Sequence, residues 1–344
     1  MTDFAFRIRA IDDTGAFADR DFSIKVRNTV TDRMVLVDAT NAYTSPDGVN
    51  WTTRVNQGGI GVAHGGGVWL VWTSTATYRT SPDGVNWTTR TLPTWSQFTT
   101  PHFSYANGRW MAIWVKTGNP SSSPSAWTSL DGVTWTEGGV VAGAISAGRI
   151  IYGNGRWFAC NNTSSTGVHG YTSTDDGVNW TTVSTGAGTA NVIDAIFING
   201  LWILVDFTGT RVLTSSNLTT WTARSLSGLV GNAARIVYGN GRLVIPPFAP
   251  SGNPVSGYDK VMTSEDGVTW TARTFPAFKP GSSGTTGPHT PNIVYTHGQF
   301  YMVSNSGGSA ANTDGFRVST DGITWTRPAT PTGFYNGIAR MSLS

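Results

Sequence analysis

The sequence has few of the residues on which several classes of protein depend. Its 344 residues include a single cysteine, Cys160, so no internal disulfide is expected. We expect Cys160 to be a small residue of the core. No apolar run approaches the ~18 residues of a membrane-spanning helix, and the N-terminus lacks the pattern of a secretory signal. No helical periodicity of useful length is present. These absences favour an all-β protein that does not insert into a membrane.

Positive charge is also sparse and dispersed. The net charge is +3, only four lysines occur, and arginines such as Arg109 and Arg156 recur at equivalent places after turns. Nucleic-acid binding needs a concentrated basic face. We therefore expect no nucleic-acid partner.

Groups for metal chemistry are equally scarce. The five histidines show no metal-ligand spacing, and Asp175-Asp176 lacks the alternating oxygen ligands of a calcium loop. The glycine-rich stretches have no strand-to-helix context, so none qualifies as a phosphate-binding loop. We expect no metal and no cofactor.

What the sequence does have is one repeated phrase, Ser-x-Asp-Gly-x-x-Trp. Asp and Ser side chains can accept nearby backbone N–H groups and Gly permits a positive φ, so each copy predicts a turn between two strands. The fourth copy carries one extra residue, and the fifth has Asn217-Leu218 in place of Asp-Gly. We expect the tryptophans to be largely buried and equivalent in position. The seven copies end at Trp51, Trp87, Trp135, Trp180, Trp221, Trp270 and Trp325.

A second phrase completes each unit. Asn107-Gly108, Asn154-Gly155 and Asn240-Gly241 each separate two apolar runs, which indicates a two-residue hairpin. The two phrases together give four strands per unit, here called A to D. Radial repetition of such units is typical of a β-propeller.

The first unit lacks strand A, and a matching segment occurs at the C-terminus. Residues 339–343 align with residues 148–152, which places Met341 opposite Ile150 in the alignment. We therefore predict that Ile338 to Leu343 supplies the missing strand. The result is a seven-bladed propeller over residues 32–344, closed by the C-terminal strand and without open edges.

Residues 1–31 differ from the repeats. Two runs of alternating apolar residues flank a turn at residues 12–15, which predicts a β-hairpin similar to the last two strands of an immunoglobulin- or cadherin-like domain. A lone hairpin is marginal in water, so we expect it to mediate assembly with its own copies or with another protein's sheet. The residues expected to make this contact are Phe4, Phe6, Ile8, Phe22, Ile24 and Val26.

The repeated box resembles the Asp-box (BNR) repeat of sialidase-type propellers, in which the boxes are structural turns. Truncated Ig-like strands followed by such repeats resemble bacteriophage virion proteins, such as fibre, neck or tail appendages. The resemblance implies a non-enzymatic virion structural protein that displays its propeller for attachment or assembly. Other virion proteins would be its partners, through the hairpin, and the chain would form a homo-oligomer.

Two alternatives remain open. The propeller can be a carbohydrate-binding module for a host surface glycan, or a sialidase-like hydrolase. Phe6-Arg7-Ile8-Arg9 is similar to the Phe/Tyr-Arg-Ile-Pro motif of sialidases, but Arg9 replaces the proline. The chain has only two glutamates: Glu137 follows a box tryptophan and Glu265 lies inside a box turn. Because no carboxylate pair is recognisable, we expect no catalytic residues.

The variable segments all fall on one face of the predicted propeller, which carries the B–C and D–A loops. Binding residues commonly lie on loops above a rigid scaffold, and aromatic faces suit sugar rings or protein partners. The alternative is that these rings cover their own loops. The aromatic residues of this face outside the repeat pattern, and hence the candidate ligand-binding residues, are Trp95, Phe248, Tyr258, Phe275 and Phe278.

Overall fold

A computed structural model describes residues 2–11, 17–26, 33–73, 76–93, 102–114, 124–141, 149–163, 167–248, 258–276, 292–304, 315–328, 335 and 337–340. Within these ranges the chain forms strands and turns and no helix, and hence no helix able to cross a membrane.

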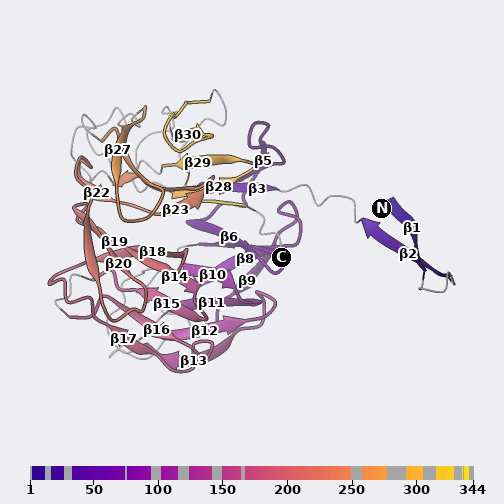
Figure 1. Cartoon of the computed structure of the whole chain (residues 1–344), viewed down its shortest axis with the longest axis horizontal. Helices are drawn as coiled ribbons and strands as arrows, with labels where there is room; N and C mark the ends of the chain where they lie inside the picture. The colour runs from indigo at the N-terminus through magenta and orange to yellow at the C-terminus, as the bar shows by residue number, and fades with distance from the viewer. Residues whose placement is uncertain are drawn as a thin grey trace.

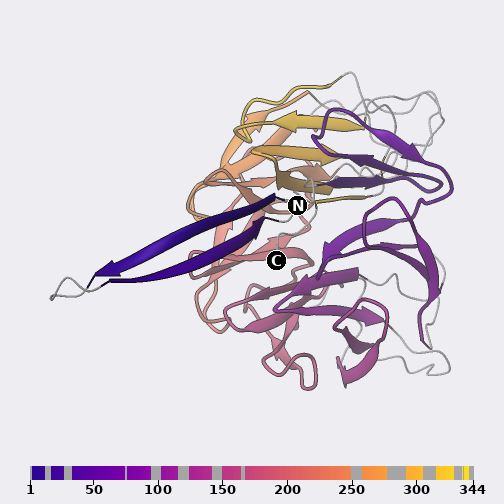
Figure 2. The same ribbon diagram turned by 90° about the vertical axis from the view of Figure 1, so that its right-hand side faces the viewer.

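Seven antiparallel sheets surround a common centre, where the innermost strand of each blade lies (Figure 1 and Figure 2). From the centre outward, blade 1 consists of β31 (Gly337–Arg340), β3 (Met34–Val37), β4 (Ala42–Ser45) and β5 (Thr52–Arg54). Blade 2 consists of β6 (Gly61–Gly65), β7 (Val68–Trp72), β8 (Thr77–Ser81) and β9 (Thr88–Thr91). Blade 3 consists of β10 (His102–Ala106), β11 (Arg109–Trp114), β12 (Ser125–Ser129) and β13 (Thr136–Val140).

The remaining blades follow the same order. Blade 4 consists of β14 (Ile150–Gly153), β15 (Arg156–Cys160), β16 (Gly170–Ser173) and β17 (Thr181–Val183). Blade 5 consists of β18 (Val192–Ile198), β19 (Leu201–Asp206), β20 (Arg211–Ser215) and β21 (Thr222–Ser225). Blade 6 consists of β23 (Val237–Gly239), β24 (Arg242–Ile245), β26 (Lys260–Ser264) and β27 (Thr271–Thr274), with an extra pair formed by β22 (Asn232–Ala233) and β25 (Pro247–Phe248). Blade 7 consists of β28 (Asn292–Thr296), β29 (Gln299–Val303) and β30 (Phe316–Ser319), and a single bridge joins Val318 to Thr326.

Each Ser-x-Asp-Gly box forms the expected turn between strands C and D. In the first box, Oδ1 of Asp47 accepts the backbone N–H groups of Val49 and Asn50 at 2.8 and 2.7 Å. The N–H of Gly48, at a φ of 74°, donates to Oγ of Ser45 at 2.8 Å. One carboxylate and one hydroxyl thus satisfy the backbone donors of the turn, which explains the recurrence of these residue types.

The degenerate fifth box keeps the same turn. Oδ1 of Asn217 accepts the N–H groups of Thr219 and Thr220, both at 2.9 Å, as the aspartate does elsewhere. Leu218 takes the place of Gly with a φ of 64°, a conformation that costs a residue with a Cβ more than it costs glycine. The side-chain acceptor therefore specifies the turn even where the glycine is missing.

The box tryptophans occupy equivalent positions, but they are less enclosed than a core residue. Trp325 is buried, whereas the other six are partly exposed. The indole N–H of Trp51 donates to the carbonyl of Gly48 at 3.1 Å, and five other boxes repeat this bond. Trp135 instead donates to the hydroxyl of Tyr78 at 3.1 Å. The fully buried tryptophans at the start of strand B are Trp69, Trp110, Trp157 and Trp202.

The Asn-Gly turns between strands A and B are also confirmed. Asn107 and Gly108 have φ values of 52° and 70°, and Asn154 and Gly155 have values of 49° and 72°. Two successive positive φ angles characterise the type I′ turn of a two-residue hairpin.

The C-terminal strand closes the ring, as predicted, but in a different register. β31 pairs antiparallel with β3, with Leu36 opposite Ile338. In blade 4 the equivalent of Leu36 is Ala159, which lies opposite Ile150. Ile338 is therefore the counterpart of Ile150, and the alignment that gave Met341 this role is wrong by three residues. Residues 341–344 lie outside the described part of the chain.

The predicted N-terminal hairpin forms β1 (Thr2–Ile11) and β2 (Phe17–Val26), which make a two-stranded sheet of their own. The register places Phe4 opposite Ile24 and Phe6 opposite Phe22. The backbone thus brings the apolar positions of the two strands to the same level along the ribbon.

The blades pack through apolar side chains, and in three of these interfaces an aromatic ring of one blade packs against a glycine of the preceding blade. A Cβ on Gly65, at the end of β6, would overlap the ring of Tyr105 from blade 3. In the same way a Cβ on Gly153 would overlap Phe197, and one on Gly239 would overlap Tyr295. The glycines belong to blades 2, 4 and 6 and the rings to blades 3, 5 and 7. Because glycine has no side chain, the aromatic ring of the next blade can rest on the backbone of the inner strand at this position.

Cys160 is buried, as expected of a core residue.

Candidate functional site: the axial cavity

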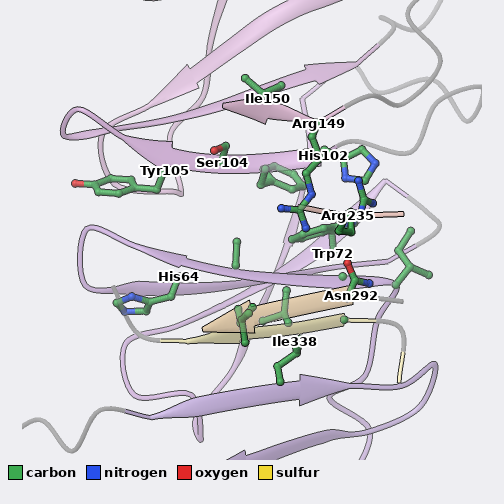
Figure 3. A pocket seen from close by; sticks show the side chains of 18 of the residues that line it. His64, Trp72, His102, Ser104, Tyr105, Arg149, Ile150, Arg235, Asn292 and Ile338 are labelled. Carbon is green, nitrogen blue, oxygen red and sulfur yellow. The ribbon is translucent and has the colours of Figure 1, made fainter. Parts of the chain in front are cut away.

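A cavity of about 310 Å³ lies where the inner strands meet, lined mainly by β6, β10, β14, β28 and β31. Val62, Ile150 and Ile338 are among the apolar residues that line it. Figure 3 shows that its two ends differ. His64 and Tyr105 lie toward one end, whereas Arg149, Arg235 and His102 gather at the other, beside Trp72 and Asn292.

The polar end is built from one position that recurs in every blade. In each blade, the strand register identifies the inner-strand residue that is equivalent to Ile150 of blade 4. The position in question is the residue immediately before it. Because all inner strands run in the same direction around the axis, these seven residues surround one mouth of the cavity. We call them the mouth ring; in blades 1 to 7 they are Gly337, Gly61, His102, Arg149, Asp194, Arg235 and Asn292.

Asp194 is the buried acidic residue of the mouth ring, and hydrogen bonds hold its carboxylate in place. It is 1% exposed, and its Oδ1 accepts the N–H of Ala195 at 2.9 Å. Its Oδ2 accepts the N–H of Ile236, in blade 6, at 3.1 Å and lies 3.9 Å from Nε of Arg149, in blade 4. One buried carboxylate therefore links three adjacent blades and orients a guanidinium at the mouth.

Arg235 brings a second guanidinium to the same place. It is half-buried, and its Nη1 donates to the carbonyl of Ile193 at 3.4 Å. Burial, followed by repulsion from the charge of Arg149, lowers the pKa of Arg235 to about 10. Arg235 thus stays protonated at neutral pH, and two positive charges at the mouth face the single negative charge of Asp194.

The opposite side of the mouth ring has no side chains. A Cβ on Gly61 would overlap the indole ring of Trp72, which packs edge-on against His102 with ring centroids 6.4 Å apart. A Cβ on Gly337 would lie 3.1 Å from the Cα of Gly61, closer than ordinary van der Waals contact. The two glycines allow the inner strands of blades 1 and 2 to approach closely, and they place Trp72 at the wall of the cavity.

Three of the five aromatic residues predicted to bind ligand belong to the described part of the chain; they lie outside the mouth ring, and two of them, Phe248 and Tyr258, come together. Phe248 packs edge-on against Phe207, with centroids 4.9 Å apart, and a Cβ on Gly231 would contact both its carbonyl oxygen and the Tyr258 ring. Phe275 is only 3% exposed, so its selection as a ligand-binding residue is corrected: it packs in the core.

The reason is local. The N–H of Phe275 donates to the carbonyl of Asp259 at 2.8 Å, which continues the pairing of β26 and β27 and turns the ring inward. Trp95 and Phe278 lie outside the described residues. Of the six apolar hairpin residues predicted to mediate assembly, the structure describes the backbone pairing given above.

The mouth ring escaped the search for loop aromatics because its members are scattered through the sequence. A signal was nevertheless present. In five of the seven units a polar or charged residue directly precedes the apolar residue of strand A that corresponds to Ile150, and only alignment of the units on that strand would have revealed it.

Carboxylates in the described part of the chain do not form a catalytic pair at this mouth. Asp194 is the one acidic member of the ring and is engaged by backbone N–H groups. Glu137 accepts a hydrogen bond from Ser125 at 3.1 Å, and the exposed Glu265 pairs with Arg242 at 2.6 Å. No group of three His, Cys, Asp or Glu side chains among the described residues is placed to hold a metal ion.

No protein-family model and no curated protein matches the sequence. Solved structures do match the fold. A structure of YCF48 bound to D1 peptide is 15% identical, with 86% of this chain and 84% of that chain covered and a TM-score of 0.53. Virginiamycin B lyase from Staphylococcus aureus is 10% identical, with 88% and 96% covered and a TM-score of 0.59. A streptogramin B lyase is 10% identical, with 81% and 86% covered and a TM-score of 0.58. At these identities the likeness establishes the fold, a seven-bladed β-propeller.

Proposed function

We propose that this chain is a non-enzymatic structural protein of a bacteriophage virion, in which the hairpin anchors and the propeller is displayed for attachment. The observation that carries the proposal is the closure of the ring by β31. Because the C-terminal strand supplies the inner strand of blade 1, the propeller needs no strand from residues 1–31. The two edges of the hairpin are thus available to another sheet.

The arrangement of charged groups supports binding rather than catalysis. Asp194 is buried and holds backbone N–H groups and Arg149, which is the role of a structural carboxylate. A glycoside hydrolase would need a second carboxyl group at a defined separation, and the described part of the mouth ring offers none.

Deletion of residues 1–31 tests the anchoring role. We expect the truncated chain to keep its melting temperature, to lose mass in solution as the oligomer dissociates, and to fail to join particles. The double variant Phe6→Asp/Phe22→Asp should act likewise, because these residues are paired apolar positions. The control is Ala5→Asp/Ser23→Asp, a pair one residue further along the same ribbon. An unchanged oligomer that still joins the particle after the deletion would remove the basis for anchoring.

A second candidate function is recognition of a host surface glycan. Phe248 and Tyr258 meet at Gly231 beside blades 5 and 6, and partly exposed aromatic rings are suited to stacking on sugars. A glycan array with the full chain, followed by Tyr258→Ala and Phe248→Ala, tests this role. Retained binding in both variants would exclude these two rings as the platform.

A further inference from the structure

We propose that the mouth ring binds a tetrahedral oxyanion, a phosphate group in particular, with Arg149 and Arg235 as its principal donors. The inference goes beyond the attachment role and does not depend on the hairpin. It rests on the charge of the mouth, the directions from which its donors come, and the space beneath them.

The charge of the mouth favours an anion. Arg149 and Arg235 contribute two positive charges, and Asp194 removes one. The remaining charge lies at the end of a cavity that is lined in part by Val62, Ile150 and Ile338, where water screens it less than it would on an open surface.

Asp194 orients this charge without competing for the ligand. Its two oxygens accept the N–H groups of Ala195 and Ile236, so the carboxylate is already engaged. It faces Nε of Arg149 at 3.9 Å, which leaves the two terminal nitrogens of that guanidinium for a ligand. Arg235 uses one terminal nitrogen for the carbonyl of Ile193. Each arginine therefore keeps N–H groups that have no partner among the described residues.

The directions of the donors select the shape of the anion. Arg149 comes from blade 4 and Arg235 from blade 6, and Figure 3 shows both side chains converging at the end of the cavity where His102 and Asn292 also lie. A carboxylate presents two oxygens in one plane and is best met by a single guanidinium from one side. A phosphate presents oxygens in several directions, which matches two guanidinium groups that reach the mouth from different blades.

The cavity also has room for more than the anion. Its volume of about 310 Å³ lies at the lower end of the range for small-molecule sites. Below the mouth the lining residues include Val62, Ile150 and Ile338, and Trp72 flanks the entrance. The site therefore accepts free phosphate or a phosphate group of a surface polymer, and the experiment separates these sources.

The test titrates the full-length protein with inorganic phosphate, followed by isothermal calorimetry and by broadening of the phosphorus NMR signal. We expect binding that Arg149→Gln and Arg235→Gln each weaken by about 10- to 100-fold, the effect of one lost charge-assisted hydrogen bond. The matched control is Arg224→Gln on β21, where Nε of Arg224 donates to Thr214 at 3.3 Å. This control should bind phosphate like the unmodified protein.

Asp194→Asn separates the proposal from a purely structural role of these residues. The substitution removes the negative charge that opposes the arginines, so phosphate should bind more tightly even though the protein melts at a lower temperature. A thermal melt of each variant establishes that the arginine variants remain folded. If Asp194→Asn weakened binding in the folded protein, the electrostatic argument would be refuted.

Three further ligands complete the design. Sulfate should compete with phosphate, whereas acetate and glucuronate should bind at least tenfold more weakly. A glycerol-phosphate polymer at equal phosphate concentration identifies a polymer-borne group if it binds more tightly than inorganic phosphate, and free phosphate if it does not. Equal affinity for the carboxylates, or phosphate binding unaffected by either arginine variant, overturns the proposal. Neither result would bear on the anchoring role, which the hairpin variants test separately.

Discussion

Substitution of Gly153 by alanine should destabilise the propeller through a single added methyl group. The Cβ would overlap the side chain of Phe197, which rests on the backbone of β14 from the next blade. Gly153 does not have a positive φ, so the backbone itself accepts alanine and the cost is steric. Overpacking of this kind costs about 1–3 kcal/mol, partly offset by the ~0.4–1 kcal/mol that alanine gains by restricting the unfolded chain.

The matched control is Gly167→Ala. A Cβ at Gly167 would have no atom within 4 Å, and its φ is also not in the left-handed region. This variant should be neutral or slightly more stable than the unmodified protein. Urea unfolding of both variants, followed by tryptophan fluorescence, measures the difference in the free energy of unfolding, which we expect to be about 1–3 kcal/mol.

A double-mutant cycle attributes the loss to the ring. In the background of Phe197→Ala the added methyl group has no ring to displace, so Gly153→Ala should cost little there. Equal unfolding midpoints for Gly153→Ala and Gly167→Ala would refute the reasoning that the ring needs a bare backbone. So would a loss that persists unchanged without Phe197.

The remaining predictions concern closure, the tryptophans and pH. Deleting residues 336–344 removes β31 and should lower the melting temperature strongly by opening the ring; an unchanged melt would contradict the closure. Trp110→Ala should cost about 3–5 kcal/mol in urea unfolding, as for a fully enclosed large aromatic, and Trp180→Ala less because its ring is partly exposed; equal losses would contradict this order. Hydrogen bonds from the N–H groups of Thr269 and Val268 lower the pKa of Asp266 from 3.8 to about 2. Such carboxylates stabilise the fold fully above their unfolded pKa, so melting temperatures should fall as the pH drops from about 4 to about 2, and Asp266→Asn should reduce that dependence.

Local chemistry explains what the sequence predicts well. The box of Ser45, Asp47 and Gly48 makes its turn from its own side chains, so its structure depends little on the rest of the chain. The Asn-Gly turns are equally self-contained. The first unit lacks strand A, and the likeness of residues 339–343 to residues 148–152 then identified the C-terminal segment as its replacement.

Features that depend on several blades could be predicted only from a correct alignment of the inner strands. Arg340 and Arg149 sit in similar apolar contexts, and only strand pairing shows that Ile338 corresponds to Ile150. The mouth ring exists only after seven inner strands converge. Phe275 has the local surroundings of a loop residue, and an additional backbone bond to Asp259 draws it into the core.

The closure of blade 1 also determines how the propeller bears mechanical tension. If the hairpin anchors the protein as proposed, tension on the hairpin enters the propeller through residue 33 and reaches β3 first. This strand is bonded along both edges, to β31 on one side and to β4 on the other. A strand at the edge of a sheet peels away one bond at a time, whereas β3 yields only when both rows of hydrogen bonds break. The C-terminal strand β31 thus stabilises β3, the first strand of the propeller, where the tension is applied.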